Sequence, residues 1–460
     1  MLKGFFTSSV TVLLIASALI GGPVSAYAQP QSAGREEIPV TEEKNTAASE
    51  SEPVYAEEIT QSLTYSIENT DAAPYWRSIL DGSNMSHAVI PEDFVISALS
   101  DVPVGGVYIE SDEPVGTMHV SFDGRTIDRT ENTFLHFYID GISADELMIW
   151  FDKSVSITDI HFFSEGEKPD YVQTWEPVLE RPDVLLLPAH YDDELLYFGG
   201  VIPWCIERGA SVMVAYFCSH EFEEHRKHEM LDGLWESGIR NYPIFGEYHD
   251  SGNVFLDDAL WRLKYDGYEW EDLLERQVRI YRQFKPQVVL THAEDGEYGH
   301  CQHILYELLA VEAAAVSGDA DFFPDSAEKY GVYEVPKVYV HDYVSDHGQI
   351  VLDLDQPLET RNGMTSYEVT VAALKKHATQ VDYFYSWLIL PQRASEIRNY
   401  SPCRWGLYIT NVGDDTSTDT FFDNIILLND KERDAREAEE PEQNAPPSLP
   451  LPDGQYLLPA

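Results

Sequence analysis

Basic residues are scarce in this sequence. Lysine and arginine together number 30 among 460 residues, against 80 aspartates and glutamates, so the formal net charge is −50 at pH 7. Nucleic-acid binding requires a basic surface, and the composition argues against that class of partner. An acid excess of this size is typical of a solvated, soluble surface; the alternative is that it attracts cationic substrates or products.

Cysteine and long apolar runs are also rare. The four cysteines are Cys205, Cys218, Cys301 and Cys403, and none of them forms a C-x-x-C motif. Disulfides are compatible with this spacing but cannot be assigned from it, and a chain of this size can fold without them. Beyond the first 30 residues no stretch approaches the ~18 continuous apolar residues of a membrane span.

The N-terminus does contain an apolar run. It reads MLKGFFTSSVTVLLIASALIGGPVSAYAQP, with Lys3 before the run and an A-x-A pattern, AYA, after it. This arrangement predicts a signal peptide over residues 1–28, cleaved after Ala28. A retained N-terminal anchor is the alternative. No cysteine lies near the cleavage site, so a lipoprotein is not expected. We therefore expect a secreted, extracellular protein, with association to the cell envelope left open and no transmembrane anchor after cleavage.

The length favours more than one domain. Residues 29–56 are rich in Glu, Ser, Thr and Ala and predict a disordered acidic linker. Residues 57–172 contain alternating segments such as GTMHVSFDG and SVSITDIHFFS, separated by turn residues, which is the pattern of an antiparallel β-sandwich. Residues 429–460 are dominated by acids and prolines and predict a tail.

The pattern changes near residue 181. DVLLLPA is a continuous apolar run, as expected for a parallel strand covered on both faces. Segments of helical and strand character then alternate, including SVMVAYFCS, EHRKHEMLDGLWESG, EDLLERQVRIYRQFK, PQVVLTH and KVYVHDY. LLYFGGVIPWCIERG predicts one helix that ends at Gly209, and YPIFGEYHD approaches a third strand. The alternation predicts an α/β domain over residues 181–428, built on a doubly wound, Rossmann-like and mostly parallel sheet and preceded by the smaller sandwich.

Two groups of polar residues follow strands of this predicted sheet. His190, Asp192 and Asp193 come directly after DVLLLPA, and His300 and His303 come after PQVVLTH. Ligands of open parallel sheets bind beyond the carboxyl ends of the strands, so we expect both groups to face one crevice. Catalytic zinc takes three His or carboxylate ligands and keeps one position open, which His190, Asp193 and His303 would satisfy. Asp192 is then placed for a general base.

Each residue also has a structural interpretation. An aspartate before a helix, such as Asp193, is often an N-cap. A single histidine near a helix start, such as His300 or His303, is often a hydrogen-bonded structural residue. Glu194 is more consistent with the positive end of a helix than with ligand binding. These alternatives weaken when both groups lie at strand ends of one sheet.

Three motifs in this order carry a family resemblance. PAHYDDE resembles the A-H-P-D-D-E signature of the PIG-L/LmbE family, the zinc-dependent N-acetylglucosaminyl de-N-acetylases. GEYGHCQH resembles its Gly-His-x-x-His signature, and RKHEMLDGLWESGI is similar to its R-x-x-E helix. YHD lies where the family has an acid after its third strand. The resemblance covers roughly residues 182–345.

The resemblance implies a role for each matched residue. His190, Asp193 and His303 match the ligands of one Zn²⁺ per chain, with another divalent metal as an alternative. Asp192 matches the general base that takes a proton from water. His300 matches the histidine that stabilises the oxyanion and helps to protonate the leaving amine.

Two further residues match substrate-binding positions. Arg226 matches an arginine that holds sugar hydroxyls or phosphate; a salt bridge to Glu229 within its helix is the alternative. Asp250 matches the acid of the third strand.

The chain departs from the signatures at three positions. Tyr191 replaces a proline, which would change the rim of the pocket. Cys301 and Gln302 replace Pro-Asp between the two histidines, which removes an acid that could tune His300. We expect Cys301 to serve in helix packing rather than as a metal donor.

The resemblance implies a zinc hydrolase that releases acetate from N-acetylglucosamine-containing glycans or glycoconjugates, and the predicted signal peptide implies that it is secreted. The front domain is loosely similar to discoidin-like, galactose-binding sandwiches, in the segment YWRSILDGSNMSHAV. A structural sandwich is the alternative for that domain. For the whole protein, the alternatives are a non-catalytic carbohydrate-binding or adhesion protein on the same fold, and a two-metal phosphoesterase, for which extra ligands are lacking.

Overall fold

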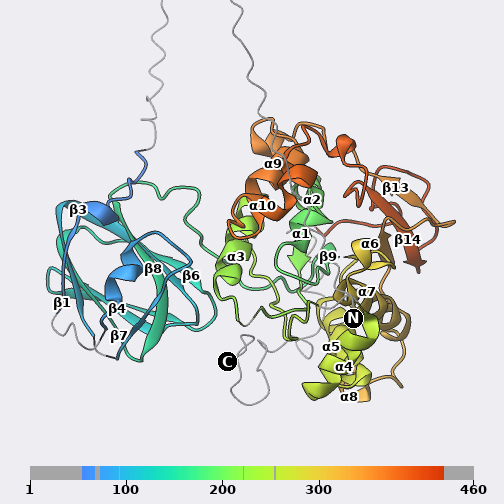
Figure 1. Ribbon diagram of the computed structural model, residues 1–460, viewed down its shortest axis with the longest axis horizontal. Coiled ribbons are helices and arrows are strands. Elements are labelled where there is room, and N and C mark those ends of the chain that lie inside the picture. Colours follow the sequence, from blue (N-terminus) through green and yellow to red (C-terminus); the bar gives the residue numbers. More distant parts are fainter. Residues whose placement is uncertain (1–53, 68–72, 93, 221, 253–254, 429–460) are drawn as a thin grey trace, which may run out of the picture. The chain divides into compact units, whose positions relative to one another are not determined.

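The computed structural model describes residues 54–67, 73–92, 94–220, 222–252 and 255–428 (Figure 1). The predicted signal peptide (1–28) and tail (429–460) lie outside these residues, and so does the predicted linker apart from its end at 54–56. The described chain contains two sheets, one of eight strands and one of six.

The eight-stranded sheet is antiparallel and precedes the other in sequence. Its strands are β1 (Thr64–Ile67), β2 (Ala88–Ile90), β3 (Ile96–Ser111), β4 (Gly116–Phe122), β5 (Arg125–Glu131), β6 (His136–Ile139), β7 (Ala144–Phe151) and β8 (Val155–Ser164). Two 3₁₀ turns, η1 (Thr60–Ser62) and η2 (Trp76–Leu80), accompany it. Every second side chain of β4 is buried, namely Met118, Val120 and Phe122, so the alternation in the sequence reports the core-facing side.

The long strand β3 takes part in two layers. Its first part, Ile96–Leu99, pairs with β1 and β7, whereas its second part pairs with β8 from Val104 onward and with β6 from Val107 onward. The register shifts between Leu99 and Val104, where β3 changes partners. The strands therefore fold around one apolar core that contains Ile109, Ile149 and Phe162.

The second sheet has the order β10-β9-β11-β12-β14-β13. Its strands are β9 (Val184–Leu186), β10 (Val212–Val214), β11 (Val288–Thr291), β12 (Lys337–His341), β13 (Gln349–Val351) and β14 (Arg404–Thr410). The first four run parallel, and β14 runs antiparallel to both β12 and β13. Since β9 lies between β10 and β11, the chain leaves β9 on one side and returns on the other, which creates a topological switch point there.

Helices cover both faces of this sheet. They are α1 (Asp193–Leu196), α2 (Val201–Glu207), α3 (His225–Ser237), α4 (Leu256–Tyr265), α5 (Trp270–Phe284), α6 (Gly296–Gly299), α7 (Cys301–Val316), α8 (Pro324–Tyr330), α9 (Ser366–Leu374) and α10 (Val381–Phe384), with the π-helical η4 (Tyr385–Ile389) and the 3₁₀ turns η3 (Glu359–Arg361) and η5 (Ala394–Glu396).

Successive residues of β9 enter different cores. Val184 and Leu186 belong to the cluster that includes residues of α2, α3 and α9, whereas Leu185 belongs to the cluster that includes residues of α5 and α7. A strand buried on both faces must be apolar throughout, which explains the run DVLLLPA.

The predicted fold class is correct only in part. The chain is a mixed α/β protein, but its larger sheet is the antiparallel one, and the mostly parallel description applies to four strands of the second sheet. β14 breaks the expectation because it starts beside the end of β12, where Trp405 pairs with His341. From that position it can only run back along β12.

Two local expectations also change. The single helix predicted after Glu194 is divided into α1 and α2 at Gly199–Gly200, where Gly200 has a φ of 88°. A Cβ atom on Gly199 would lie 2.2 Å from the carbonyl oxygen of Leu195, so glycine is required at this break. The segment YPIFGEYHD forms isolated parallel bridges, such as Ala215 with Ile244, rather than a continuous strand.

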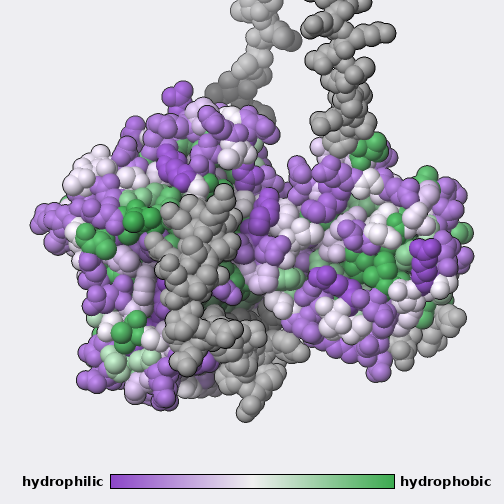
Figure 2. Space-filling view, turned by 180° about the vertical axis from the view of Figure 1, so that it is seen from behind, coloured by the Kyte–Doolittle hydropathy of each residue, from purple (hydrophilic) through white to green (hydrophobic). Residues whose placement is uncertain are grey.

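The surface agrees with the acidic composition. On the face seen in Figure 2, hydrophilic residues predominate and hydrophobic patches are scattered between them. Among the described segments between residues 54 and 428, none of the helices is long and apolar enough to cross a membrane.

Candidate metal centre

Side chains from two distant loops meet beyond the carboxyl ends of β9 and β11. The Nδ1 atom of His190 lies 3.0 Å from Oδ2 of Asp193, and Nε2 of His303 lies 3.3 Å from the same oxygen. The two imidazole nitrogens are 3.2 Å apart. All three residues are buried, with exposed fractions of 8%, 2% and 1%. The structure therefore brings His190, Asp193 and His303 together.

The chemistry of these atoms fits a metal ion. Two ligands about 2.0 Å from a tetrahedral zinc are separated by about 3.3 Å, close to the observed spacings. Nδ1 of His303 faces Oε2 of Glu297 at 2.7 Å, and Nε2 of His190 faces Oε1 of Gln302 at 3.2 Å. When those outer nitrogens donate hydrogen bonds, the inner nitrogens can supply lone pairs to a metal ion bound beside Oδ2 of Asp193. Two lone pairs and a carboxylate converging on one point form a donor set for a cation.

Neighbouring residues offer further donors. The groups His190–His300–His303, Asp193–His292–His303 and His190–Cys218–Asp250 each have ligand atoms within 4.8 Å of one another. All three share residues with the set above, so they describe one cluster around the ends of β9 and β11. Its imidazole and carboxylate donors are suited to zinc and related divalent metals.

Asp192, the predicted base, lies beside this set and is 5% exposed. Its Oδ2 accepts a hydrogen bond of 2.9 Å from Nη2 of Arg226, which also donates to the backbone oxygen of Tyr191 at 2.8 Å. Burial raises the pKa of Asp192 to about 7, against the opposing charge of Arg226.

Arg226 is thus tied to Asp192 rather than to Glu229 on its own helix. Glu229 instead accepts hydrogen bonds from the backbone nitrogen and hydroxyl of Thr379, at 2.8 and 2.7 Å. Since Nη2 of Arg226 already donates to Asp192, the predicted binding of sugar hydroxyls would have to use the other N–H groups of its guanidinium.

His300 immediately precedes α7, and its ring lies edge-on to that of His190 and tilted against that of His303. Its centroid lies 4.6 Å from that of His190 and 4.6 Å from that of His303. Burial, reinforced by the two neighbouring imidazoles, lowers the pKa of His300 to about 3, so the ring is neutral at pH 7. Its Nδ1 has no hydrogen-bond partner among the described residues.

Asp250 lies on the opposite side of His190. Its Oδ1 is 3.6 Å from Nε2 of His190 and its Oδ2 is 3.5 Å from Nδ1 of His220. Burial alone would raise the pKa of Asp250, but the charge of His190 and its hydrogen bond outweigh that effect and lower it well below its usual range. The structure therefore places this predicted substrate residue next to a metal-ligand candidate.

The positions that depart from the family signatures have defined surroundings. Tyr191 is fully buried and packs on Tyr216 and His220, so the expected change at the pocket rim is wrong. Cys301 is buried in the core at the start of α7. Gln302 hydrogen-bonds to His190 and to the backbone oxygen of His249, so it contacts a ligand candidate rather than His300.

Four residues that contact the ligand candidates or one another at this site were not among the predicted site residues. They are His292, Glu297, Gln302 and His341. His292 follows β11 directly and His341 is the last residue of β12, so the strand-end rule that selected His190 also applied to them. Glu297 joins these two histidines and His303 through hydrogen bonds. No spacing rule indicated that contact.

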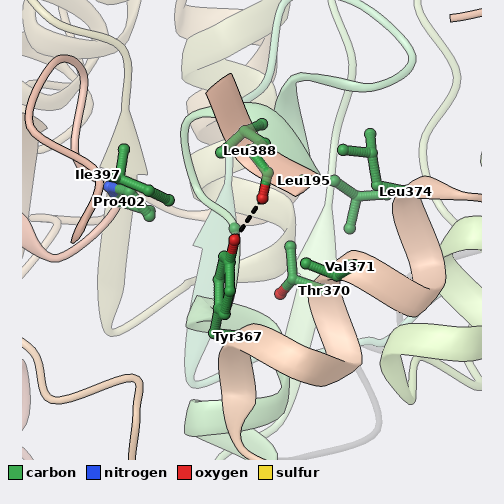
Figure 3. Close-up of a pocket in the computed structure, with 9 residues that line it drawn as sticks. Leu195, Tyr367, Thr370, Val371, Leu374, Leu388, Ile397 and Pro402 are labelled. Carbon is green, nitrogen blue, oxygen red and sulfur yellow. Dashed lines mark hydrogen bonds between the residues drawn. The ribbon is translucent and has the colours of Figure 1, made fainter. Parts of the chain in front are cut away.

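A small cavity elsewhere in the α/β domain has a different character. Tyr367 stands in it with its hydroxyl bonded to the backbone oxygen of Leu388 (Figure 3). Its lining is Leu195, Gly199, Tyr367, Thr370, Val371, Leu374, Leu388, Ile397 and Pro402. None of these side chains titrates near neutral pH, so the cavity is a packing gap rather than a reaction site.

Comparisons with known proteins agree with the geometry. The family described as "PIG-L: GlcNAc-PI de-N-acetylase" matches residues 185–314. The 1D-myo-inositol 2-acetamido-2-deoxy-alpha-D-glucopyranoside deacetylase of Streptomyces scabiei is 27% identical over 183 residues, which are 34% of this chain and 54% of that protein. The enzyme of the same name from Streptomyces avermitilis is 25% identical over 271 residues, 47% of this chain and 90% of that protein.

The chain thus spans about half the length of the Streptomyces scabiei relative. Among solved structures, N,N'-diacetylchitobiose deacetylase from Pyrococcus horikoshii is 16% identical with a TM-score of 0.36, covering 50% of this chain and 86% of that one. The family match includes both loops that supply the cluster. Residues 185–314 of this chain therefore match the PIG-L de-N-acetylase family, and the match spans the ligand candidates His190, Asp193 and His303.

Proposed function

We propose that this protein is a secreted, zinc-dependent N-deacetylase. It hydrolyses the N-acetyl group of N-acetylglucosamine-containing glycans or glycoconjugates and releases acetate. The observation that carries the proposal is the approach of His190 Nδ1, Asp193 Oδ2 and His303 Nε2 to within 3.0–3.3 Å of one another. A carbohydrate-binding protein has no need of that donor set.

His190, Asp193 and His303 would hold the metal through two imidazole nitrogens and one carboxylate oxygen. A zinc ion bound there supplies a Lewis acid for the acetyl carbonyl and lowers the pKa of bound water to about 7.

The chain's own residues perform the proton transfers. Asp192 adjoins the ligand Asp193, and its carboxylate takes the proton of the attacking water. Arg226 fixes the orientation of that carboxylate through its 2.9 Å hydrogen bond. A neutral His300 has one N–H to donate, which suits an oxyanion on the former acetyl group. The amine then leaves with the proton that Asp192 received.

The substrate class follows from the family match and from the relatives' names, each of which denotes a deacetylase of an acetamido sugar. Secretion is supported by Lys3, the apolar run and the AYA pattern of residues 1–28, which lie outside the described residues. The net charge of −50 argues against nucleic acid as a partner.

An acetate-release screen tests the proposal. Purified protein is treated with chelator, reloaded with Zn²⁺, and incubated with N-acetylated mono- and oligosaccharides. We expect acetate from at least one N-acetylglucosamine compound, loss of release after chelation, and loss in His303→Ala. Glycan binding by the zinc-loaded protein without any acetate would refute the proposal and favour a non-catalytic carbohydrate-binding protein.

A further inference from the structure

Glu297 occupies a backbone conformation that is rare for any residue with a side chain. It lies within α6, between Gly296 and Tyr298, with φ 60° and ψ −82°. These angles are near the γ-turn geometry that is strained for L-residues and is normally left to glycine. Such a conformation persists only where the surrounding contacts hold it, so the contacts of the side chain explain why glutamate stands here.

The carboxylate of Glu297 is fully buried and joins three histidines. Oε2 lies 2.7 Å from Nδ1 of His303, and Oε1 lies 3.0 Å from Nδ1 of His341. Nδ1 of His292 is 3.2 Å from both oxygens. The backbone nitrogen of Ala293 also donates to Oε1 at 3.0 Å. One side chain thus links the end of β11, the end of β12 and the first turn of α7.

These contacts determine which nitrogen of each ring carries hydrogen. A carboxylate only accepts, so His303 donates from Nδ1 to Glu297, and Nε2 is the nitrogen whose lone pair would bind a metal ion. Nε2 lies 3.3 Å from Oδ2 of Asp193, the carboxylate oxygen of the same proposed ligand set. Nε2 of His292 accepts from the backbone nitrogen of Ala189 at 2.9 Å, so its Nδ1 must be the donor to Glu297.

The same carboxylate therefore supports both halves of the cluster. It contacts His303 directly, and through His292 it fixes Ala189, the residue before His190. A metal-ligating histidine usually donates its second N–H to a carboxylate or carbonyl, and loss of that partner typically weakens metal binding.

We propose that Glu297 is a positioning residue of the metal centre: its carboxylate selects the tautomer of His303 that turns Nε2 toward the metal, and the strained backbone at residue 297 is retained for that contact. The inference rests on the proposed zinc site. It adds a residue that neither the signature motifs nor the ligand set identifies.

The test measures zinc affinity without any substrate. Wild type, Glu297→Gln and Glu297→Gly are compared by competition with a chromophoric zinc chelator, and the melting temperature of each metal-free protein is recorded. The amide nitrogen of glutamine at 297 would direct N–H groups at the N–H donors that surround this side chain. It would favour the His303 tautomer that carries hydrogen on Nε2 instead of Nδ1. We expect the dissociation constant to rise about 10–100-fold in both variants. Glycine removes the backbone strain, so Glu297→Gly should melt above Glu297→Gln.

A matched control is Glu307→Gln. Glu307 lies further along α7, is 2% exposed, and forms no hydrogen bond with the three histidines within the described residues. Its substitution should leave zinc affinity unchanged.

The outcomes separate the two proposals. Unchanged zinc affinity in folded Glu297→Gln would overturn the positioning role, whatever happens to the melting temperature, and so would a wild type that binds no zinc. A wild type that binds zinc and loses affinity on substitution, yet releases no acetate from any sugar, would leave the positioning role intact and refute the deacetylase function.

Discussion

Replacing Asp192 by asparagine should separate proton transfer from folding and metal binding. The amide has the same shape, and its oxygen can still accept the hydrogen bond from Nη2 of Arg226. Because burial raises the pKa of Asp192 to about 7, the neutral and charged forms have similar free energies at neutral pH. In the unfolded chain the pKa of aspartate is about 3.9, so a charged Asp192 destabilises the folded state at neutral pH, and its neutral replacement should not lower the free energy of unfolding.

Turnover should fall far more than stability. A positioned general base contributes roughly 10²- to 10⁴-fold, so loss of the acceptor should raise the activation free energy by about 3–5 kcal/mol. Acetate release measures kcat, metal analysis gives the zinc content, and thermal unfolding gives the stability. Asp232→Asn is the control, since burial also raises the pKa of this α3 aspartate to about 7. Full turnover in Asp192→Asn, or loss of zinc together with activity, would contradict the assignment of Asp192 as the base.

Three predictions concern stability. Asp415→Asn would leave Lys337 buried without its ion-pair partner, and urea unfolding should show a loss of about 3–5 kcal/mol. Leu374→Ala enlarges the apolar cavity of Figure 3 and should cost about 2–5 kcal/mol in the same assay. Burial would lower the pKa of His161, but carboxylates, chiefly Glu110, raise it to about 10. The protonated ring therefore stabilises the fold fully below about pH 6.5, and this stabilisation is lost as the pH rises toward 10. Unfolding free energies across this window should decline less in His161→Gln, and equal declines would show that the ring does not contribute.

The parts of the site that could be predicted from sequence follow one rule. Polar residues placed directly after an apolar strand must lie at the carboxyl edge of a parallel sheet, and β9 and β11 are neighbours. That rule alone brings His190, Asp193 and His303 into one region, although 113 residues separate the two histidines. The helices α3, α5 and α7 were also evident from their periodicity, because each has a long buried face.

The remaining parts depend on contacts that have no local signature. The role of Glu297 could not be predicted, because its partners His292, His303 and His341 come from three elements, and because a glutamate directly after Gly296 is typical of a loop. The antiparallel direction of β14 could not be predicted from sequence either. The segment is apolar like a parallel strand, and only its starting position beside His341 determines the direction in which it runs.

Arg226 shows why tertiary contacts prevail over the local pairing that its sequence suggests. A pair with Glu229, three residues along α3, would contribute roughly 0.2–0.5 kcal/mol on an exposed helix. Asp192 is buried, and an uncompensated buried charge costs about 3–5 kcal/mol. Because the cost of leaving the buried charge unpaired exceeds the gain from the helix pair, Arg226 donates to Asp192, and Glu229 accepts a hydrogen bond from Thr379. The R-x-x-E pattern of this helix therefore marks two residues that each serve a partner on a different element.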